Sequence, residues 1–264
     1  MNLVIIGTGN TAHILGRKFR AAGHRILQVA GRQAAPAAEL AQLLGAEAVT
    51  GWQGIRPGAD LYLVSVSDNA LPEVAGTLRL PGQVVAHTAA SVPCSVLEPV
   101  SERCGVFYPL QTLRKEMTAL PDIPVYIDGR DEAVLAVLDR LGRTIAYGPV
   151  TIAGDAERLT LHLAAVLVSN FTNHLYALAE QFCRQEGIVF EQLVPLIHQT
   201  ALRMGTIRPQ AAQTGPAIRR DDQTLRRHEQ LLSGHPELLT LYRMFTGSIR
   251  RLQEESPREG SAAQ

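Results

Sequence analysis

A glycine-rich turn directly after a short apolar segment constrains the fold of this chain most strongly. Residues 2–6 predict a β-strand, and they are followed by Gly7-Thr8-Gly9-Asn10-Thr11-Ala12 and by a helical pattern that ends near Gly23. This is the G-x-G-x-x-A form of the turn that opens a dinucleotide-binding βαβ unit. The glycines allow a tight turn and a close approach to a pyrophosphate, and the alanine allows the helix to pack closely on the sheet. We therefore expect these six residues to hold a diphosphate at the helix N-terminus.

The end of the second predicted strand, residues 25–30, indicates which dinucleotide binds. Proteins that prefer NAD place Asp or Glu about 20 residues beyond the glycine turn, where it holds the ribose 2′-hydroxyl. Here Gly31 and Arg32 occupy that position, and the first acidic residue is Glu39. Because a guanidinium group binds a 2′-phosphate in bidentate fashion and stacks on adenine, Gly31 and Arg32 favour NADP over NAD. The alternative is that Arg32 is an ordinary solvated side chain.

Length, charge and cysteine content narrow the class of protein. The 264 residues suffice for two domains or one enlarged domain, and 25 basic residues balance 25 acidic ones, so we expect neither nucleic acid nor a membrane as a partner. Cys94, Cys104 and Cys183 have no metal-ligand spacing, which argues against a disulfide framework and a metal site and favours the cytoplasm. The longest apolar stretch, 159–168, is too short to span a bilayer.

Strand and helix patterns alternate over the first 150 residues, and helical patterns alone follow. This predicts the α/β class, with a Rossmann dinucleotide-binding domain at 1–150 and an all-helical domain at 151–264. Strands are expected at 46–50, 60–66, 83–87, 105–108, 124–127 and 144–147, and helices at 36–44, 70–78, 132–141, 155–186, 193–204, 222–232 and 236–251. The helical domain has many apolar positions and few partners, so we expect a homodimer that forms through it.

Polar residues follow three predicted strands at the edge where doubly wound sheets bind ligands. The cofactor-binding residues expected there are Ser65, Val66, Ser67, Asp68, His87, Thr88 and Gln111. Of these, Ser67, Thr88 and Gln111 are expected to orient a nicotinamide ring. The alternative is that they only form loops and cap helices.

A polar stripe on the long predicted helix is the best candidate for the substrate-facing wall. At about 100° per residue, Ser169 and Asn173 fall on the same face as His162, with Asn170 at its edge. Buried polar groups need partners, and a substrate cleft or a hydrogen-bond network between helices would supply them. Thr214 precedes Gly215-Pro216, a pair that predicts a rigid turn. This turn could hold Thr214 at a cleft, and the alternative is that it only interrupts a helix. His162, Asn170, Asn173 and Thr214 are the predicted catalytic residues.

Together these segments resemble the bacterial family of Rossmann-like NADP oxidoreductases with an uncharacterised C-terminal helical domain. The resemblance spans residues 1–252 and is carried by segments 7–12, 87–89, 105–112, 162–165, 170–174 and 213–217, with Asp221. It implies a helical domain like that of 6-phosphogluconate dehydrogenase and kinship to pyrroline-5-carboxylate reductase and deazaflavin-dependent NADP oxidoreductase. One segment departs from the reductase, which carries Pro-Asn-Thr-Pro where this chain has Pro109-Leu110-Gln111-Thr112.

The lysine content bears on the mechanism that this resemblance implies. Similar dehydrogenases of hydroxyisobutyrate and 6-phosphogluconate, and ketopantoate reductase, use a lysine on the interdomain helix, but this chain has only Lys18 and Lys115. His162 is the best substitute acid, unless the substrate is an imine that needs little protonation. The expected function is NADPH-dependent hydride transfer to a small C=N or C=O compound. The alternatives are a non-catalytic NADP sensor and a fold that has lost its cofactor.

Overall fold

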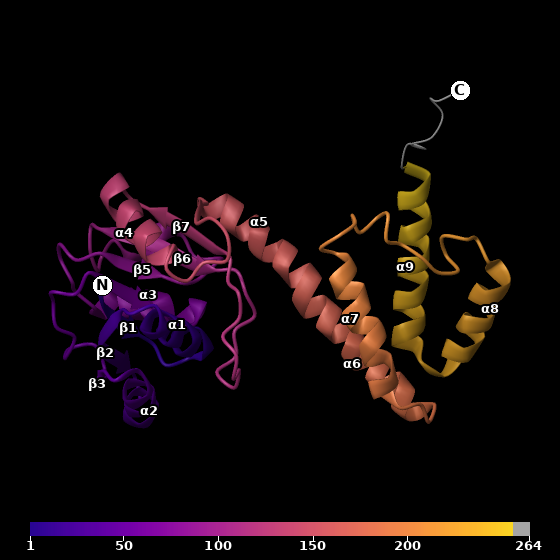
Figure 1. Cartoon of the computed structure of the whole chain (residues 1–264), viewed down its shortest axis with the longest axis horizontal. Coiled ribbons are helices and arrows are strands. Elements are labelled where there is room, and N and C mark those ends of the chain that lie inside the picture. The colour runs from indigo at the N-terminus through magenta and orange to yellow at the C-terminus, as the bar shows by residue number, and fades with distance from the viewer. Residues whose placement is uncertain (256–264) are drawn as a thin grey trace. The chain divides into compact units, whose positions relative to one another are not determined.

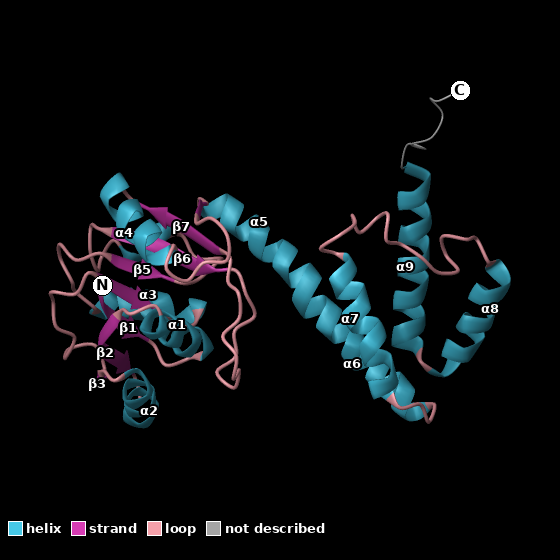
Figure 2. Cartoon of the chain, in the orientation of Figure 1, coloured by secondary structure: helices cyan, strands magenta, loops and turns pink. Residues whose placement is uncertain are grey.

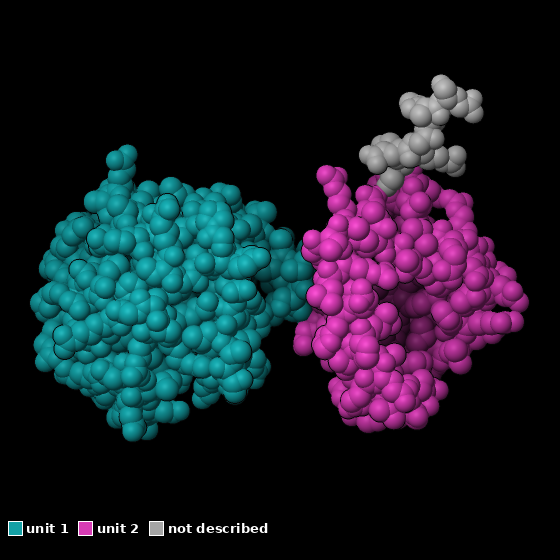
Figure 3. Space-filling view, in the orientation of Figure 1, with its two compact units in different colours: residues 1–171 teal, residues 172–264 magenta. Residues whose placement is uncertain are grey.

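The computed structural model describes residues 1–255 and divides the chain into two compact units (Figure 3). Unit 1 is Met1–Phe171 and unit 2 is Thr172–Gln264. This division falls within the long helical segment that begins at Asp155. The functional domain boundary expected near residue 150 stays a prediction.

An eight-stranded sheet forms the centre of unit 1 (Figures 1 and 2). Its strands follow the order β3-β2-β1-β4-β5-β6-β7-β8, and neighbours are parallel except for the antiparallel pair β6 and β7. The strands are β1 Asn2–Ile6, β2 Arg25–Gly31, β3 Glu47–Thr50, β4 Leu61–Val64, β5 Val85–His87, β6 Cys104–Pro109, β7 Val125–Gly129 and β8 Thr151–Ile152. From the boundary between β1 and β4, the strands follow one another as β1, β2 and β3 toward one edge of the sheet and as β4 to β8 toward the other. The predicted doubly wound α/β fold is therefore confirmed.

Helices cover both faces of this sheet because successive side chains of each strand point to opposite sides. Leu3 and Ile5 of β1 pack in one core with residues of α1, α2 and α4, whereas Val4 and Ile6 pack in another with residues of α3. These helices span α1 Asn10–Ala21, α2 Ala34–Leu44, α3 Leu71–Thr77 and α4 Glu132–Gly142. The loops beyond the carboxyl ends of the strands are therefore where unit 1 can bind a ligand.

The strand expected at 144–147 is wrong. Residues 144–146 instead form a turn at the end of α4, in which their N–H groups bond the carbonyls of Leu141 and Gly142. Only an isolated bridge joins Ala146 to Ile123, and β8, at Thr151–Ile152, pairs with β7. The apolar segment 144–147 has the composition of a strand, but the open carbonyls at the end of α4 hold it as a turn.

The long helix expected at 155–186 is present, with an interruption that the sequence did not predict. It consists of α5 Asp155–Ala165, a π-helical turn at Val166–Phe171 and α6 Thr172–Gln185, and Gly187 follows in the left-handed conformation. The wider turn alters the angle per residue, so the regular phase assumed for the polar stripe does not hold across 166–171. Such turns are often found at functional sites.

Unit 2 is helical, as predicted. After α6 it contains α7 Val194–Arg203, α8 Asp222–Leu231 and α9 Pro236–Glu255, joined by irregular segments and short 3₁₀ turns. Among its described hydrophobic residues, only Leu178, Cys183, Ala217 and Leu225 are buried. Exposed large apolar side chains include Leu196, Leu202, Met204, Leu231, Met244 and Phe245. Every helix within residues 1–255 is too short or too polar to cross a bilayer.

Candidate functional site

Two glycines of the turn between β1 and α1 have different roles. Gly7 has a φ of +121°, and a Cβ there would lie 2.2 Å from the carbonyl oxygen of Ser65. Glycine at position 7 is thus required for the turn to pack against the end of β4. Gly9 has an ordinary φ of −83°, and a Cβ there would meet no atom within 4 Å. The fold does not require this second glycine, and it lies at the N-terminus of α1, where the first N–H groups lack helical partners.

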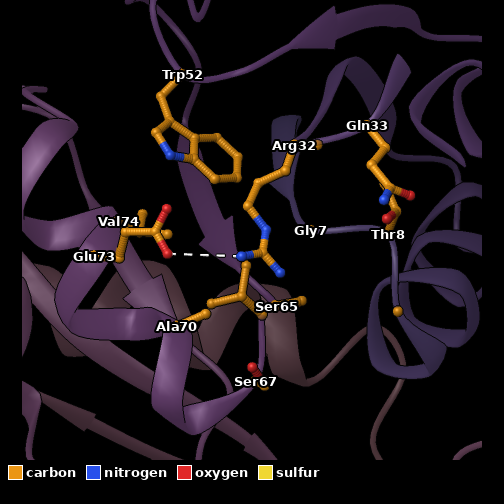
Figure 4. Close-up of a pocket in the computed structure, with 13 residues that line it drawn as sticks. Gly7, Thr8, Arg32, Gln33, Trp52, Ser65, Ser67, Ala70, Glu73 and Val74 are labelled. Atoms are coloured by element: carbon orange, nitrogen blue, oxygen red, sulfur yellow. Dashed lines mark ion pairs between the residues drawn. The ribbon is translucent and has the colours of Figure 1, made fainter. Parts of the chain in front are cut away.

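This turn opens onto a hollow of about 590 Å³, here named the first cavity (Figure 4). It extends from the turn to the end of β2 and to the segment that follows β4. Predicted cofactor-binding residues line much of it, namely Gly7, Thr8, Gly9, Gly31, Arg32, Ser65, Val66 and Ser67. Gln33, Trp52, Ala70, Glu73 and Val74 complete the lining and were not predicted.

Arg32 lies in the first cavity, immediately after β2. Its side chain is 67% exposed, and its Nη1 lies 3.7 Å from Oε2 of Glu73, which is 58% exposed. Figure 4 shows Arg32, Glu73 and Trp52 pointing toward one another, while Gly7 and Thr8 lie on the other side of Arg32. A ligand in this cavity can therefore contact a cation, an acid and an aromatic ring at one end and the glycine turn at the other.

A second cavity of about 600 Å³ lies in unit 1 beyond the ends of β5 and β6 and beside α5. Six predicted site residues from several segments line it, namely Thr11, Asp68, Thr88, Gln111, His162 and Asn170. Asn170 belongs to the π-helical turn, whose Ser169 and Val168 also line the cavity. The fold thus brings the polar end of α5 to the strand ends, and the hydroxyl of Thr112 is 2.9 Å from that of Ser169.

The side chains of Tyr108 and His162 form a hydrogen-bonded pair in the wall of the second cavity. The Tyr108 hydroxyl lies 3.2 Å from Nδ1 of His162, and the two rings meet edge to face. Burial raises the pKa of Tyr108 to about 12, so its hydroxyl keeps its proton at neutral pH. Within the described residues the other ring nitrogen of His162, Nε2, has no protein partner. The pair therefore offers a fixed ring with one nitrogen left for a ligand.

The prediction that His87 binds the cofactor is not supported by its position. The side chain is fully buried, Nδ1 accepts the N–H of Ala89, and Nε2 donates to the carbonyl of Pro93. Burial, together with the nearby Arg158, lowers the pKa of His87 to about 4, so the ring is neutral. His87 shapes the loop that carries Thr88, and it lines neither cavity.

Other predicted cofactor-binding residues already have protein partners. The Gln111 amide donates to the carbonyl of Asp122 and accepts the N–H of Thr112. Asp68 accepts the hydroxyl of Ser91, and the side chain of Asn10 accepts the N–H of Lys115. Ala12 is fully buried and packs α1 on the sheet, so its side chain is not available to a ligand.

Asn173 and Thr214 belong to unit 2, where Asn173 lies in α6 and Thr214 in the irregular segment before α8. Their participation in the site stays a prediction.

Arg158 of α5 was missed by the sequence analysis and organises the wall of the second cavity. It is 1% exposed and donates to the carbonyls of Ala90, Val92 and Ala153, and it pairs with Asp155 at 2.6 Å. An arginine on an apolar helix was the signal that could have identified it, because a buried guanidinium needs several acceptors.

Two family models match separate parts of the chain. Residues 1–112 match the family described as Rossmann-like domain, and residues 123–249 match the domain of unknown function DUF2520. No curated protein matches the chain.

Solved structures share the fold over almost the whole chain. A Bacteroides fragilis protein described as a "putative NADP oxidoreductase" is 37% identical, with a TM-score of 0.85 over 95% of this chain and 98% of that one. A reductive aminase from Aspergillus terreus in complex with NADPH and ethyl-5-oxohexanoate is 17% identical, with a TM-score of 0.67 over 97% and 94% of the two chains. A pyrroline-5-carboxylate reductase from Coxiella burnetii is 16% identical, with a TM-score of 0.57 over 96% and 97%. As its motifs predicted, the chain belongs to the family of Rossmann-like NADP oxidoreductases with a DUF2520 helical domain.

Proposed function

We propose that the protein is an NADPH-dependent oxidoreductase that reduces a small compound with a C=N or C=O bond. The observation that carries the proposal is the position of Gly9, where the fold tolerates a side chain but the sequence leaves an open approach to the N-terminus of α1. A glycine that the fold does not need indicates that something else must approach the backbone there.

The first cavity suits the diphosphate and the adenosine half of the cofactor. The turn from Gly7 to Ala12 presents backbone N–H groups to the diphosphate. Arg32, at the end of β2, holds the 2′-phosphate, and Trp52 offers an aromatic face to the adenine. Gly31 is needed because a Cβ there would lie 2.8 Å from Cγ2 of Thr8, so the end of β2 stays close to the glycine turn.

The second cavity suits the nicotinamide and the substrate. In this proposal Ser67, Thr88 and Gln111 orient the nicotinamide ring. Ser67 lines the first cavity, and Thr88 and Gln111 line the second. When bound, the cofactor supplies the hydride, and the chain's own residues align the substrate and exclude water.

His162 provides the proton that must accompany the hydride. The Tyr108 hydroxyl fixes its Nδ1, so Nε2 is the nitrogen that exchanges a proton with the substrate. No lysine is among the described residues that line the two cavities, and an imidazole is the side chain that most often transfers a proton near neutral pH. Asn170 lies at the same wall and can hold the substrate by hydrogen bonds.

Unit 2 contributes through a homodimer in this proposal. Its helices leave many large apolar side chains exposed, and a second copy is the simplest partner that would cover them. Asn173 and Thr214 are proposed to complete the substrate site from this unit.

The names of similar proteins support the same reaction class. The Bacteroides fragilis relative is described as an NADP oxidoreductase, and the Aspergillus terreus structure is a reductive aminase that holds NADPH. Reduction of a carbonyl or of the imine derived from it is consistent with both descriptions.

A screen of NADPH oxidation tests the proposal. The full chain is incubated with NADPH and with panels of cyclic imines, ketones with and without amines, keto acids and deazaflavins, and the loss of NADPH absorbance is followed. We expect turnover with a member of the imine or carbonyl panels. Tight NADPH binding without turnover in any panel would contradict the proposal and favour a non-catalytic NADP sensor.

A further inference from the structure

The folded chain places an acidic residue, Glu73, in the first cavity, although it lies far from Arg32 in the sequence. The preference for NADP rests on the absence of Asp or Glu at the end of β2, where Gly31 and Arg32 stand. However, α3 brings Glu73 into the same cavity, with its carboxylate 3.7 Å from the Arg32 guanidinium. Figure 4 shows this pair next to Trp52, at the end of the cavity where the adenosine is proposed to bind.

Glu73 is presented to the cavity by the packing of its helix. Leu71, Val74 and Ala75 of α3 are buried in the core, so the remaining face of the helix points outward. The side chain of Glu73 is not used to bond its own helix, and Arg32 is the partner with which it pairs. Arg32 and Glu73 are also the only charged side chains among the described residues that line the first cavity.

We propose that Glu73 sets the cofactor selectivity of the first cavity by competing with a 2′-phosphate for Arg32. This inference rests on the proposed function, since it assumes that a nicotinamide dinucleotide occupies the cavity. With Glu73 present, the charges of the two charged side chains in the cavity cancel. A dianionic 2′-phosphate must therefore either displace the Glu73 carboxylate from Arg32 or bind close to it. For NAD the same carboxylate accepts a hydrogen bond from the 2′-hydroxyl, which is the role of the acidic residue at the end of β2 in NAD sites.

The protein is therefore a dual-cofactor binder with a reduced preference for NADP. A carboxylate about 6 Å from a dianionic phosphate in a water-like dielectric weakens binding by roughly threefold to tenfold once salt screening is included. Replacement of Glu73 by glutamine removes this repulsion and frees Arg32, while it leaves NAD with a weaker acceptor. The ratio of the two affinities should change more than either affinity alone.

Trp52 provides a direct readout that needs no substrate. It is the only tryptophan of the chain and it lines the first cavity, so its fluorescence reports on nucleotide binding there. The full chain is titrated with NADPH and with NADH at fixed ionic strength, as wild type and as Glu73→Gln. We expect Glu73→Gln to bind NADPH threefold to tenfold more tightly and NADH no more tightly than wild type.

Glu98→Gln is the matched control. Glu98 pairs with Arg130, the two side chains are 50% and 51% exposed, and neither is among the described residues that line the first or the second cavity. This variant loses the same charge from a similar ion pair, so it should leave the ratio of the affinities for NADPH and NADH unchanged. Thermal unfolding followed by circular dichroism establishes that both variants are folded.

The outcomes separate this inference from the proposed function. The inference is overturned if Glu73→Gln changes the affinity ratio no more than Glu98→Gln does. It is also overturned if Glu73→Gln shifts the ratio toward NADH, which would show that Glu73 orients Arg32 toward the phosphate. If the wild type binds neither dinucleotide, the proposed function fails together with the inference. A clear gain for NADPH in Glu73→Gln alone supports both.

Discussion

At the scale of single residues, the pair of Tyr108 and His162 is the feature most directly tied to chemistry. An imidazole next to a tyrosine whose pKa is raised to about 12 keeps a defined hydrogen bond, because the phenol does not ionise in the working range. Such a pair fixes which ring nitrogen faces a ligand. An imidazole held in one orientation in the wall of a cavity is what a proton-transfer site requires.

The substitution His162→Gln should lower kcat roughly a hundredfold, as expected when a general acid is removed, and leave the affinity for NADPH unchanged. Tyr108→Phe keeps the ring but loses its hydroxyl, so it should lower kcat less than His162→Gln does. Both are measured as initial rates with a substrate found in the screen, beside a binding titration of NADPH. If His162→Gln turns over at the wild-type rate, the acid role fails and an imine already protonated in solution becomes the better account.

At the scale of elements, buried polar groups link the loop after β5 to the helix α5. His87 bonds the backbone of this loop from within the sheet, and Arg158 bonds the same loop from α5. The loop carries Thr88, Ala89 and Ala90, which line the second cavity. Its conformation is therefore set by the core and not by solvent.

This arrangement predicts that stability falls in mild acid. The pKa of His87 is lowered to about 4 in the folded state, whereas an unfolded histidine titrates near 6.5, so the unfolded chain binds more protons between these values. Stability should be full above about pH 6.5 and decrease by about 3 kcal/mol as the pH falls to 4. Burial also lowers the pKa values of His13 and His24, which act in the same direction.

Urea unfolding at several pH values between 4 and 7 measures this effect, with His87→Gln as the comparison. The variant lacks the titrating group, so its stability should depend less steeply on pH even if it is less stable at every pH. Equal slopes for the two proteins would show that His87 is not the group responsible.

At the scale of the whole molecule, unit 2 has a small buried core for its number of helices. The exposed apolar residues Leu196, Leu202, Met244 and Phe245 lie on α7 and α9. Burial of this surface would stabilise a pair of chains by about 25 cal/mol for each Å² removed from water.

Sedimentation equilibrium of the full chain should give twice the 28.6 kDa mass of one chain. Replacement of Leu196 and Phe245 by glutamate should shift the equilibrium toward the single chain, since charges are costly at an apolar interface. Replacement of the exposed Leu43 of α2 by glutamate is a control outside unit 2. A wild-type protein that sediments as a single chain at micromolar concentration would contradict the homodimer.

Local signals explain what the sequence predicted well. The glycine turn, the position of Arg32 and the alternation of strands and helices depend on short motifs and on repeating patterns, and the structure has the predicted fold. Glu73 and Trp52 could not be assigned because they come from α3 and from the segment after β3, which only the folded sheet brings to Arg32. The π-helical turn at Val166–Phe171 could not be predicted because no residue pattern in the sequence indicates it. The strand predicted at 144–147 was wrong because hydrogen bonds to the last carbonyls of α4 hold this apolar segment as a turn.

The central claim is that the glycine turn and Arg32 bind NADPH, and calorimetric titration of the full chain with NADPH tests it most directly. The wild type should release heat and saturate at one molecule for each chain. The Gly9→Ala variant should melt at the wild-type temperature, since a Cβ there meets no atom within 4 Å, yet bind roughly tenfold to a hundredfold more weakly because the methyl group blocks the diphosphate. Absence of binding heat from the folded wild type, or equal affinity in Gly9→Ala, would contradict the account.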